Sequence, residues 1–308
     1  MTFPQLSDQF RLNRLQPPTG EVRMVLDTDT YNEIDDQFAL TYALLSPEKL
    51  TVEAVYAAPF HNNRSSGPGD GMEKSYAEIL RLLDFLGVAA DGFAFRGSTK
   101  YIGPARRPQD NAAVRDLIDK ALASPADDPL YVVAIGAITN VASALLIEPE
   151  IIQNIVVVWL GGHNLNWSHT REFNLKQDVP AAQIVLDSGV PFVIVPCLGV
   201  TSHLQTTLPE LQACIGGVNR VGDYLCQIFS EYRPDSFAAS SVIWDISTIA
   251  WLINPQWAPS DLVHSPVLTD QVTWSVDRSR HLVRVANFVQ RDPIFRDLFS
   301  KIRSQGGI

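Results

Sequence analysis

Cysteine, basic runs and long apolar runs are all scarce in this chain of 308 residues. The three cysteines, Cys197, Cys214 and Cys226, are odd in number and lack metal-ligand spacing, which argues against a disulfide scaffold and a zinc site. No segment approaches the roughly 20 apolar residues of a membrane span, and the first residues lack the apolar run of a signal peptide. We therefore expect a cytoplasmic protein without a membrane partner.

Positive charge is also in short supply. Lys and Arg number 24 against 34 Asp and Glu, which gives a net charge of −10. No basic cluster is interleaved with aromatic residues, so the composition excludes the usual nucleic-acid-binding surface. Hydrophobic residues make up 46% of the chain, which is enough to bury a large core.

Short β-branched runs alternate with segments of helical period from Arg23 onward. The expected strands are 23–26, 52–56, 131–135, 155–160 and 191–195, and the expected helices are 37–45, 73–86, 112–123, 138–146, 181–186 and 294–302. This alternation, with fully apolar strands, predicts an α/β fold with a mostly parallel sheet and helices on both faces. A late hairpin is expected between 272–276 and 282–288. Residues 1–20 are expected to be an N-terminal arm and residues 21–308 a single domain.

Four carboxylates, those of Asp27, Asp29, Asp35 and Asp36, lie within ten residues after the first apolar strand. So much negative charge repels itself unless a cation lies among it. A following helix N-terminus favours anions by only about 0.3–1 kcal/mol, which is too little for four carboxylates. The run therefore predicts a bound hard cation at the carboxyl end of a strand, where open α/β sheets bind ligands. A solvated acidic turn is the alternative.

A cation such as Ca²⁺ takes six to eight oxygen ligands, so residues distant in the sequence must complete the site. Asp245 is the best candidate for a further acid, because it precedes an apolar helical segment that runs to Ile253. The strand 131–135 ends at Gly136, where its last carbonyl is free to coordinate. An ordinary helix N-cap is the alternative interpretation of Asp245.

These motifs, in this order, resemble those of the inosine–uridine-preferring nucleoside hydrolases. The resemblance runs from about Arg23 to the C-terminus. The matching pieces are Asp27-Thr28-Asp29 with Asp35-Asp36, the turn 135–140, Leu160-Gly161-Gly162 followed by Asn166, Glu172-Phe173-Asn174 with Asp178, and Trp244-Asp245.

The resemblance implies a Rossmann-like mixed sheet of eight strands and a bound Ca²⁺. It also implies hydrolysis of the N-glycosidic bond of ribonucleosides to ribose and free base, commonly by a homo-dimer or homo-tetramer. For the Ca²⁺ ion it implies four ligands: Asp29, Asp36, Asp245 and the Ile135 backbone oxygen. It implies that Asp29 also acts as general base on a calcium-bound water and that Asp27 supports the loop from behind. For the ribose it implies that Asp35 binds the hydroxyls and that the sugar is contacted by Asn166, Glu172 and Asn174.

The chemistry of these residue types agrees with that reaction. Glycosidic bond hydrolysis passes through an oxocarbenium-like state, so positive charge grows on the sugar, and carboxylates stabilise it. A metal ion lowers the pKa of a bound water, and a neighbouring carboxylate accepts its proton. Glu172 and Asn174 are expected to lie two apart on an extended strand, where they face the same side.

Two departures from the family pattern concern the acidic loop and Trp244. Thr30–Ile34 makes the loop two residues longer than the compact family form, so its geometry must be restored by a bulge or a longer turn. Trp244 stands where many members carry a histidine and resembles the purine-preferring branch, in which an aromatic ring stacks on the base. Candidates for a second aromatic wall are Phe237, Tyr76, Phe60 and Trp167, and candidates for an acid are His61, His163, His169 or water.

Two other functions remain open from the residues alone. A phosphatase of the haloacid-dehalogenase type would use Asp27 as nucleophile with Mg²⁺. A nucleoside- or sugar-binding protein would keep the pocket with little turnover.

Overall fold

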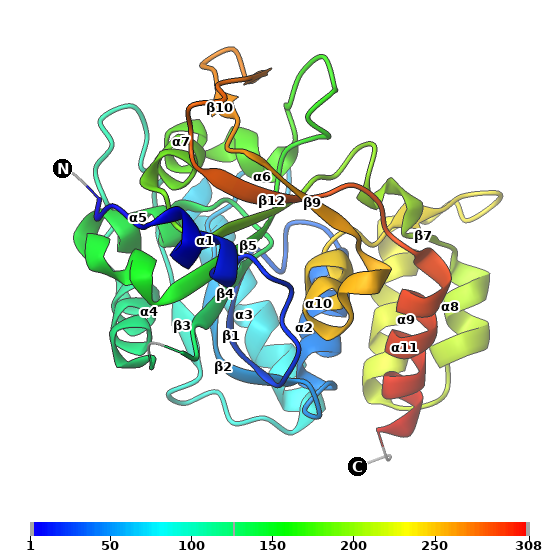
Figure 1. Ribbon diagram of the computed structural model, residues 1–308. Helices are drawn as coiled ribbons and strands as arrows, with labels where there is room; N and C mark the ends of the chain where they lie inside the picture. The colour runs from blue at the N-terminus through cyan, green and yellow to red at the C-terminus, as the bar shows by residue number, and fades with distance from the viewer. Residues whose placement is uncertain (1–2, 126, 306–308) are drawn as a thin grey trace.

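The computed structural model describes residues 3–125 and 127–305, and over this part a central sheet organises the chain (Figure 1). The eight strands of the sheet are, in spatial order, β3 (Ala94–Arg96), β2 (Leu50–Ala57), β1 (Val22–Thr28), β4 (Leu130–Ala134), β5 (Ile155–Leu160), β6 (Phe192–Val195), β12 (Leu282–Ala286) and β9 (Ser260–His264). Neighbouring strands are parallel except for β12 and β9. The predicted α/β class and mostly parallel mixed sheet are confirmed.

Helices cover both faces of this sheet. They are α1 (Asp8–Arg14), α2 (Asp35–Leu44), α3 (Pro68–Leu86), α4 (Ala112–Ala123), α5 (Thr139–Ile147), α6 (Phe173–Gln177), α7 (Val179–Ser188), α8 (Leu208–Ile215), α9 (Arg220–Tyr232), α10 (Ile246–Ile253) and α11 (Arg291–Ser304). Two short pairs complete the fold: β7 (Gln205–Thr206) with β8 (Ser241–Val242), and β10 (Val267–Leu268) with β11 (Trp274–Ser275). None of the helices in the described ranges is long and apolar enough to span a membrane.

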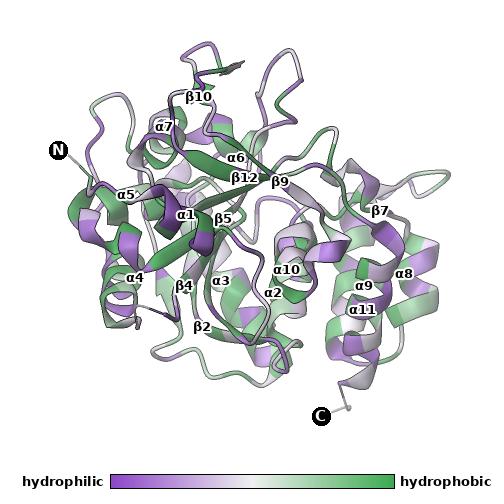
Figure 2. Cartoon of the chain, viewed as in Figure 1, coloured by the Kyte–Doolittle hydropathy of each residue, from purple (hydrophilic) through white to green (hydrophobic). Residues whose placement is uncertain are grey.

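Alternating side chains of the central strands form two separate cores. Met24 and Leu26 pack into one core with residues of α2, α3, α9, α10 and α11, whereas Val25 packs into the other with residues of α4, α5 and α7. Because successive strand residues point to opposite faces, a strand buried on both sides must be apolar throughout. The central strands β4, β5 and β6 are accordingly hydrophobic along their length, whereas the edge strand β9 carries polar residues (Figure 2).

The strand order reverses between β1 and β4. The chain runs outward from β1 through β2 to β3, returns to the other side of β1, and then runs outward from β4 through β5 to β6. Loops that leave the carboxyl ends of β1 and β4 therefore diverge, and they leave a crevice between them. The acidic turn follows β1, and Ile135 follows β4, so both lie at this crevice.

The predicted late hairpin is wrong in its pairing. The strand β11 pairs with β10, whereas β12 pairs with β9 on one side and with β6 on the other. The alternating pattern identified the strand at 282–286 but not its partners, because parallel pairing to β6 depends on the whole sheet. In the segment expected as an arm, α1 lies near β12, Leu15 is fully buried, and Arg284 Nε donates to the Leu15 carbonyl at 2.7 Å.

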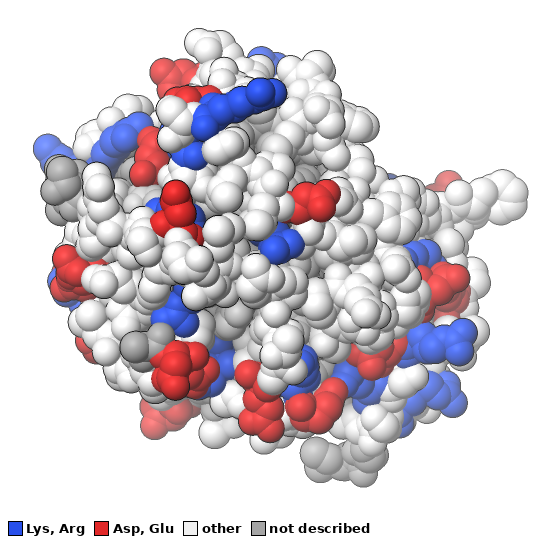
Figure 3. Space-filling view, in the orientation of Figure 1, with Lys and Arg blue, Asp and Glu red and all other residues white. Residues whose placement is uncertain are grey.

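Charges on the surface are interspersed. On the face in Figure 3, Lys and Arg lie among Asp and Glu, with no broad field of one sign. Ion pairs at the surface, such as Arg96 with Glu73 at 2.9 Å, are of the exposed kind that contributes at most about 1 kcal/mol each.

Candidate active site

A cavity of about 320 Å³ opens at the carboxyl ends of β1, β4, β5 and β6. Its volume lies in the range of small-molecule sites. The residues that line it are Asp29, Asn32, Glu33, Asp35, Asp36, Ile135, Leu160, His163, Arg171, Glu172, Phe173, Asn174, Lys176, Cys197, Leu198, Trp244 and Asp245. The crevice at the reversal of strand order therefore holds most of the residues that the sequence predicted for the site.

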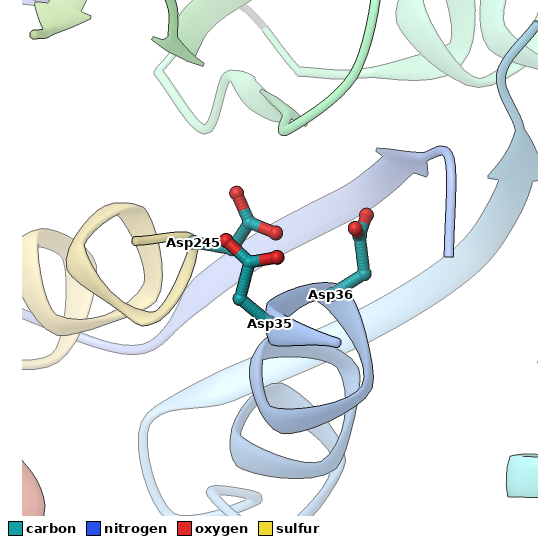
Figure 4. A group of neighbouring side chains, drawn as sticks. All are labelled: Asp35, Asp36 and Asp245. Atoms are coloured by element: carbon teal, nitrogen blue, oxygen red, sulfur yellow. The ribbon is translucent and has the colours of Figure 1, made fainter. Parts of the chain in front are cut away.

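Three carboxylates meet at the floor of this cavity. Asp35 and Asp36 begin α2, and Asp245 immediately precedes α10, which packs beside α2 (Figure 1). One oxygen from each of the three lies within 4.8 Å of the others, and the side chains converge from the two helix starts (Figure 4). Asp36 and Asp245, which are 209 residues apart in the sequence (245 − 36), are thus neighbours in the fold.

Asp29 lies in the same cavity but outside that compact trio. Both of its carboxylate oxygens are buried and lack a hydrogen-bond partner within the described residues. Gly136 lies against it, and a Cβ there would come within 3.1 Å of the Asp29 carboxylate. A buried carboxylate without a partner is costly, which indicates that something absent from the polypeptide neutralises it.

The environment raises the pKa of every acid in this group. Burial raises the pKa of Asp36 to about 7. The pKa values of Asp29, Asp35 and Asp245 are raised well above the usual range, first by burial and then by the charges of neighbouring acids. Negative charge is thus unfavourable here without a cation.

The donor set fits a hard divalent cation. All candidate ligand atoms are carboxylate or carbonyl oxygens, and no histidine belongs to the compact trio. Oxygen-only sites suit Ca²⁺, Mg²⁺ or Mn²⁺ rather than zinc. The orphaned oxygens of Asp29 provide the structural sign that the residues fit such an ion.

The longer acidic turn is held by contacts from the loop that follows β2. The Asn32 N–H donates to the Asp29 carbonyl at 2.7 Å, and Asn62 Nδ2 donates to Asn32 Oδ1 at 2.6 Å. Arg64 donates to the Glu33 carbonyl at 3.2 Å and lies 4.3 Å from the Tyr31 ring. These contacts give the longer loop the defined conformation that the sequence left open, and they bring Asp29 and Asp36 into one cavity.

Asp27 lies beneath the site and does not line the cavity. It is fully buried, and its Oδ1 accepts a hydrogen bond from Asn140 Nδ2 at 2.7 Å. Burial raises the pKa of Asp27 to about 7. Asn140 Oδ1 in turn accepts from the Ser98 N–H at 2.8 Å, which ties the end of β1 to the loop after β3. A nucleophilic role for Asp27, as the phosphatase alternative requires, does not fit this position.

Glu172 and Asn174 both line the cavity, but the expected extended strand is wrong. Glu172 is the N-cap of α6, and its carboxylate accepts hydrogen bonds from the N–H groups of Asn174 and Leu175 at 2.8 and 2.9 Å. Its Oε2 also accepts from Gly162 N–H at 3.0 Å, where Gly162 has a φ of 73° that favours glycine. An N-cap and a short strand look alike over three residues, so the sequence did not distinguish between them.

Asn174 connects two strand ends. Its Nδ2 donates to the Ile135 carbonyl at 2.9 Å and to the Leu160 carbonyl at 3.1 Å. The Ile135 carbonyl therefore lies at the cavity as expected, with one hydrogen bond already made.

The aromatic and amide candidates divide into two groups. Trp244 lines the cavity next to Asp245. Phe237 is 89% exposed and Asn166 is exposed, and neither lines the cavity. Among the histidines, His163 lines the cavity, and its pKa is lowered first by burial and then by the charge of His169.

Comparison with known proteins decides the family. A family model described as inosine-uridine preferring nucleoside hydrolase matches residues 24–295. The chain belongs to this family. As a nucleoside hydrolase it is an N-glycosyl hydrolase, and it acts on ribonucleosides.

Curated relatives agree with that placement. The chain is 31% identical over 264 residues to the "Non-specific ribonucleoside hydrolase RihC" of Salmonella agona (strain SL483), which covers 77% of this chain and 80% of the relative. It is 32% identical over 262 residues to the "Pyrimidine-specific ribonucleoside hydrolase RihA" of Escherichia coli O9:H4 (strain HS), at 76% and 80% coverage.

Solved structures show the same fold. A plant nucleoside hydrolase, PpNRh1, superposes with a TM-score of 0.73 at 20% identity, over 92% of this chain and 99% of the other. A purine-preferring ribonucleoside hydrolase from Gardnerella vaginalis gives 0.73 at 22% identity, over 91% and 98%.

Sequence reasoning missed several residues that line the cavity of this nucleoside hydrolase. Glu33 lies there because the longer turn carries it inward, and Arg171 and Lys176 flank the Glu172 cap. In the sequence, Arg171 and Lys176 were indicated only by their proximity to the Glu172-Phe173-Asn174 motif, and Glu33 only by its place in the acidic turn. Their position in the cavity depends on the conformation of the turn and on helix α6, which no periodic pattern encodes.

Proposed function

We propose that this chain hydrolyses the N-glycosidic bond of ribonucleosides, with purine nucleosides favoured, in the cavity at the end of β1 and β4. The observation that carries the proposal is the meeting of Asp35, Asp36 and Asp245 beside the partnerless Asp29. A charge-dense, buried and oxygen-lined pocket suits a reaction in which positive charge develops on a sugar.

Asp29, Asp36, Asp245 and the Ile135 carbonyl would hold a Ca²⁺ ion. Their buried oxygens and the absence of nitrogen or sulfur from the compact trio support a hard divalent cation, and the family resemblance favours Ca²⁺ among these. When bound, the ion would offset the charge of the acids and lower the pKa of a water molecule. Asp27 would brace the end of β1 through Asn140.

Asp29 would act as the general base. Its two oxygens have no partner among the described residues, so a lone pair is free to accept a proton from the attacking water. That water forms a bond to C1′ of the ribose as the C1′–N bond breaks. The leaving base takes up a proton, so the products are ribose and free base.

Polar side chains around the floor would bind the sugar. Asp35 lies where a carboxylate can accept hydrogen bonds from two vicinal hydroxyls, and Glu172 and Asn174 line the adjacent wall. Asn166 and Phe237 are proposed sugar and base contacts that would need the loops carrying them to close over the ligand, because both are exposed.

Trp244 would face the leaving base. An indole stacks on a purine over a larger area than on a pyrimidine, which supports the purine preference. His163 is the histidine of the cavity wall, and its backbone position is fixed by the Trp274 indole, which donates to the His163 carbonyl at 3.0 Å. His163 is the proposed source of the proton for the base.

The substrate proposal is tested with a panel of inosine, adenosine and uridine. We expect kcat/KM for both purine nucleosides to exceed that for uridine by about tenfold, the scale of a single stacking contact of about 1.4 kcal/mol. Trp244→Ala should lower the ratio of kcat/KM for the purine nucleosides to that for uridine. Faster turnover of uridine than of both purine nucleosides would end the purine assignment.

A cytoplasmic location and a homo-dimeric or homo-tetrameric state are also proposed, on the composition and the family resemblance. The proposed domain organisation is a single α/β domain over residues 21–308 behind the segment 1–20.

A further inference from the structure

Glu33 is an acid of the active-site cavity that the proposed function leaves without a role. In the described ranges it lies outside the compact cluster of Asp35, Asp36 and Asp245 that would help to hold the cation. It belongs to the longer turn, and it also lines a second cavity of about 600 Å³, which shares Asn32 and Glu33 with the first. Glu33 therefore lies at the boundary between the two cavities, and not at the floor of the first.

The position of Glu33 is fixed through its backbone and through its side chain. Its carbonyl accepts a hydrogen bond from Arg64 Nη1 at 3.2 Å, and the Arg64 guanidinium lies 4.3 Å from the centre of the Tyr31 ring. Its carboxylate accepts a hydrogen bond from the hydroxyl of Tyr232, the last residue of α9. A side chain that is held in this way recognises a ligand group with little loss of conformational entropy.

The carboxylate of Glu33 presents a hydrogen-bond acceptor to the cavity. Burial raises the pKa of Glu33, and the hydrogen bond from Tyr232 and the positive charges of Arg233 and Arg64 limit that rise because they favour the ionised form. An ionised carboxylate has lone pairs only and no donor. A ligand group that meets Glu33 must therefore supply the hydrogen.

Glu33 and Trp244 occupy equivalent places before two neighbouring helices. Glu33 lies two residues before Asp35, the first residue of α2, and Trp244 lies two residues before Ile246, the first residue of α10. These helices pack against each other, and both side chains line the same cavity. Among the neighbouring charges, that of Glu33 acts most strongly on Asp35, so the two carboxylates are close. With the ribose on Asp35 and the base facing Trp244, the edge of the base comes within reach of Glu33.

An acceptor at this place distinguishes bases by their ring nitrogen. Inosine carries a hydrogen on N1 and uridine carries one on N3, and each can donate it to a carboxylate. In adenosine and cytidine the same nitrogen is an acceptor, so its lone pair would face the lone pairs of the carboxylate. Their amino groups remain as alternative donors, which makes the discrimination partial. A site built to accept a hydrogen bond binds an analogue without the donor less well.

We propose that Glu33 is a specificity-determining residue that accepts a hydrogen bond from the ring N–H of the base. The site would then favour 6-oxopurine and 4-oxopyrimidine nucleosides over their 6-amino and 4-amino counterparts. This inference rests on the proposed function, because it uses the same placement of ribose and base. It is separate from the purine preference, since the two members of each pair have the same ring system and stack on Trp244 over the same area.

The test compares inosine with adenosine and uridine with cytidine. The free base released is identified by chromatography, so that deamination of adenosine or cytidine is recognised. For the wild type we expect kcat/KM to be at least about threefold higher for the N–H-bearing member of each pair. This comparison needs no variant, so it holds even where a substitution disturbs folding.

The matched variants are Glu33→Gln and Glu231→Gln. A glutamine amide can either accept or donate, so Glu33→Gln should still hydrolyse nucleosides but bring both ratios close to one. Glu231 is exposed on α9 and lines the second cavity but not the first. Its substitution should leave both ratios unchanged.

The outcomes separate this inference from the proposed function. Equal kcat/KM within both pairs in the wild type, or unchanged ratios in Glu33→Gln, would overturn the role of Glu33 and leave ribonucleoside hydrolysis in place. Ratios that fall in Glu33→Gln and not in Glu231→Gln would support it. Failure of the wild type to hydrolyse any of the four nucleosides would overturn the proposed function and this inference together.

Discussion

Replacing Asp29 with asparagine is expected to lower kcat by about 10³-fold or more. The change keeps the shape of the side chain but replaces the basic carboxylate with an amide, which is too weak a base to take the proton from water, and general base catalysis contributes about 10²–10⁴-fold. Asp29 is also a proposed ligand of the cation, so both effects act in the same direction. The measurement is release of reducing sugar from inosine by the purified variant.

The folded state should survive this substitution. Asp29 makes no side-chain hydrogen bond within the described residues, so its replacement breaks no structural contact. Asp91→Asn is a suitable control, because Asp91 is exposed in the turn between α3 and β3. Activity close to wild type in Asp29→Asn, with an unchanged melting temperature, would remove Asp29 from the mechanism.

Asp245→Asn is expected to abolish activity while it stabilises the metal-free protein. Asp245 is 2% exposed and lies within 4.8 Å of Asp35 and Asp36, so its negative charge opposes folding when no cation is bound. Removing that charge relieves repulsion. We expect the melting temperature of the chelated variant to exceed that of the chelated wild type by at least about 2 °C, the shift that about 1 kcal/mol produces in a chain of this size.

The sign of the pH dependence follows from the same charges. Burial raises the folded-state pKa of Asp36 to about 7, well above its unfolded value of about 3.8. Between these values the folded chain binds more protons than the unfolded chain, so the stability of the metal-free wild type falls as pH rises from about 4 to about 7. The gain from Asp245→Asn should therefore be larger at pH 8 than at pH 5. A variant less stable than wild type at pH 8, both chelated, would contradict the repulsion argument.

The sheet was predictable because its strands are buried on both faces. An apolar run such as 155–160 is typical of a strand covered by helices on both faces of a sheet. The alternation of such runs with helical segments implies parallel pairing. The acidic run was also informative, since the charges of Asp29, Asp35 and Asp36 repel one another in a short turn unless a cation lies among them. The position of Asp245 beside them required the family resemblance, because an acid before a helix is by itself an ordinary N-cap.

The parts that could not be predicted depend on contacts between distant loops. The longer turn is held by Asn62 and Arg64, which lie in a loop after β2 with no periodic pattern. Glu172 folds into a helix cap because the Gly162 turn supplies it with a third donor. Arg171 and Lys176 flank that cap, so their place at the cavity wall was not visible in the sequence.

We propose that acids from both ends of the chain bind one divalent ion at the floor of the cavity. The most direct test is a calorimetric titration of calcium into wild type and into Asp245→Asn, both first freed of metal with a chelator. Ribose release from inosine is assayed at each calcium concentration. We predict that the wild type binds one Ca²⁺ per chain and regains activity in proportion, whereas Asp245→Asn does neither. Full activity of the wild type in excess EDTA, or equal calcium binding by the two proteins, would contradict the account.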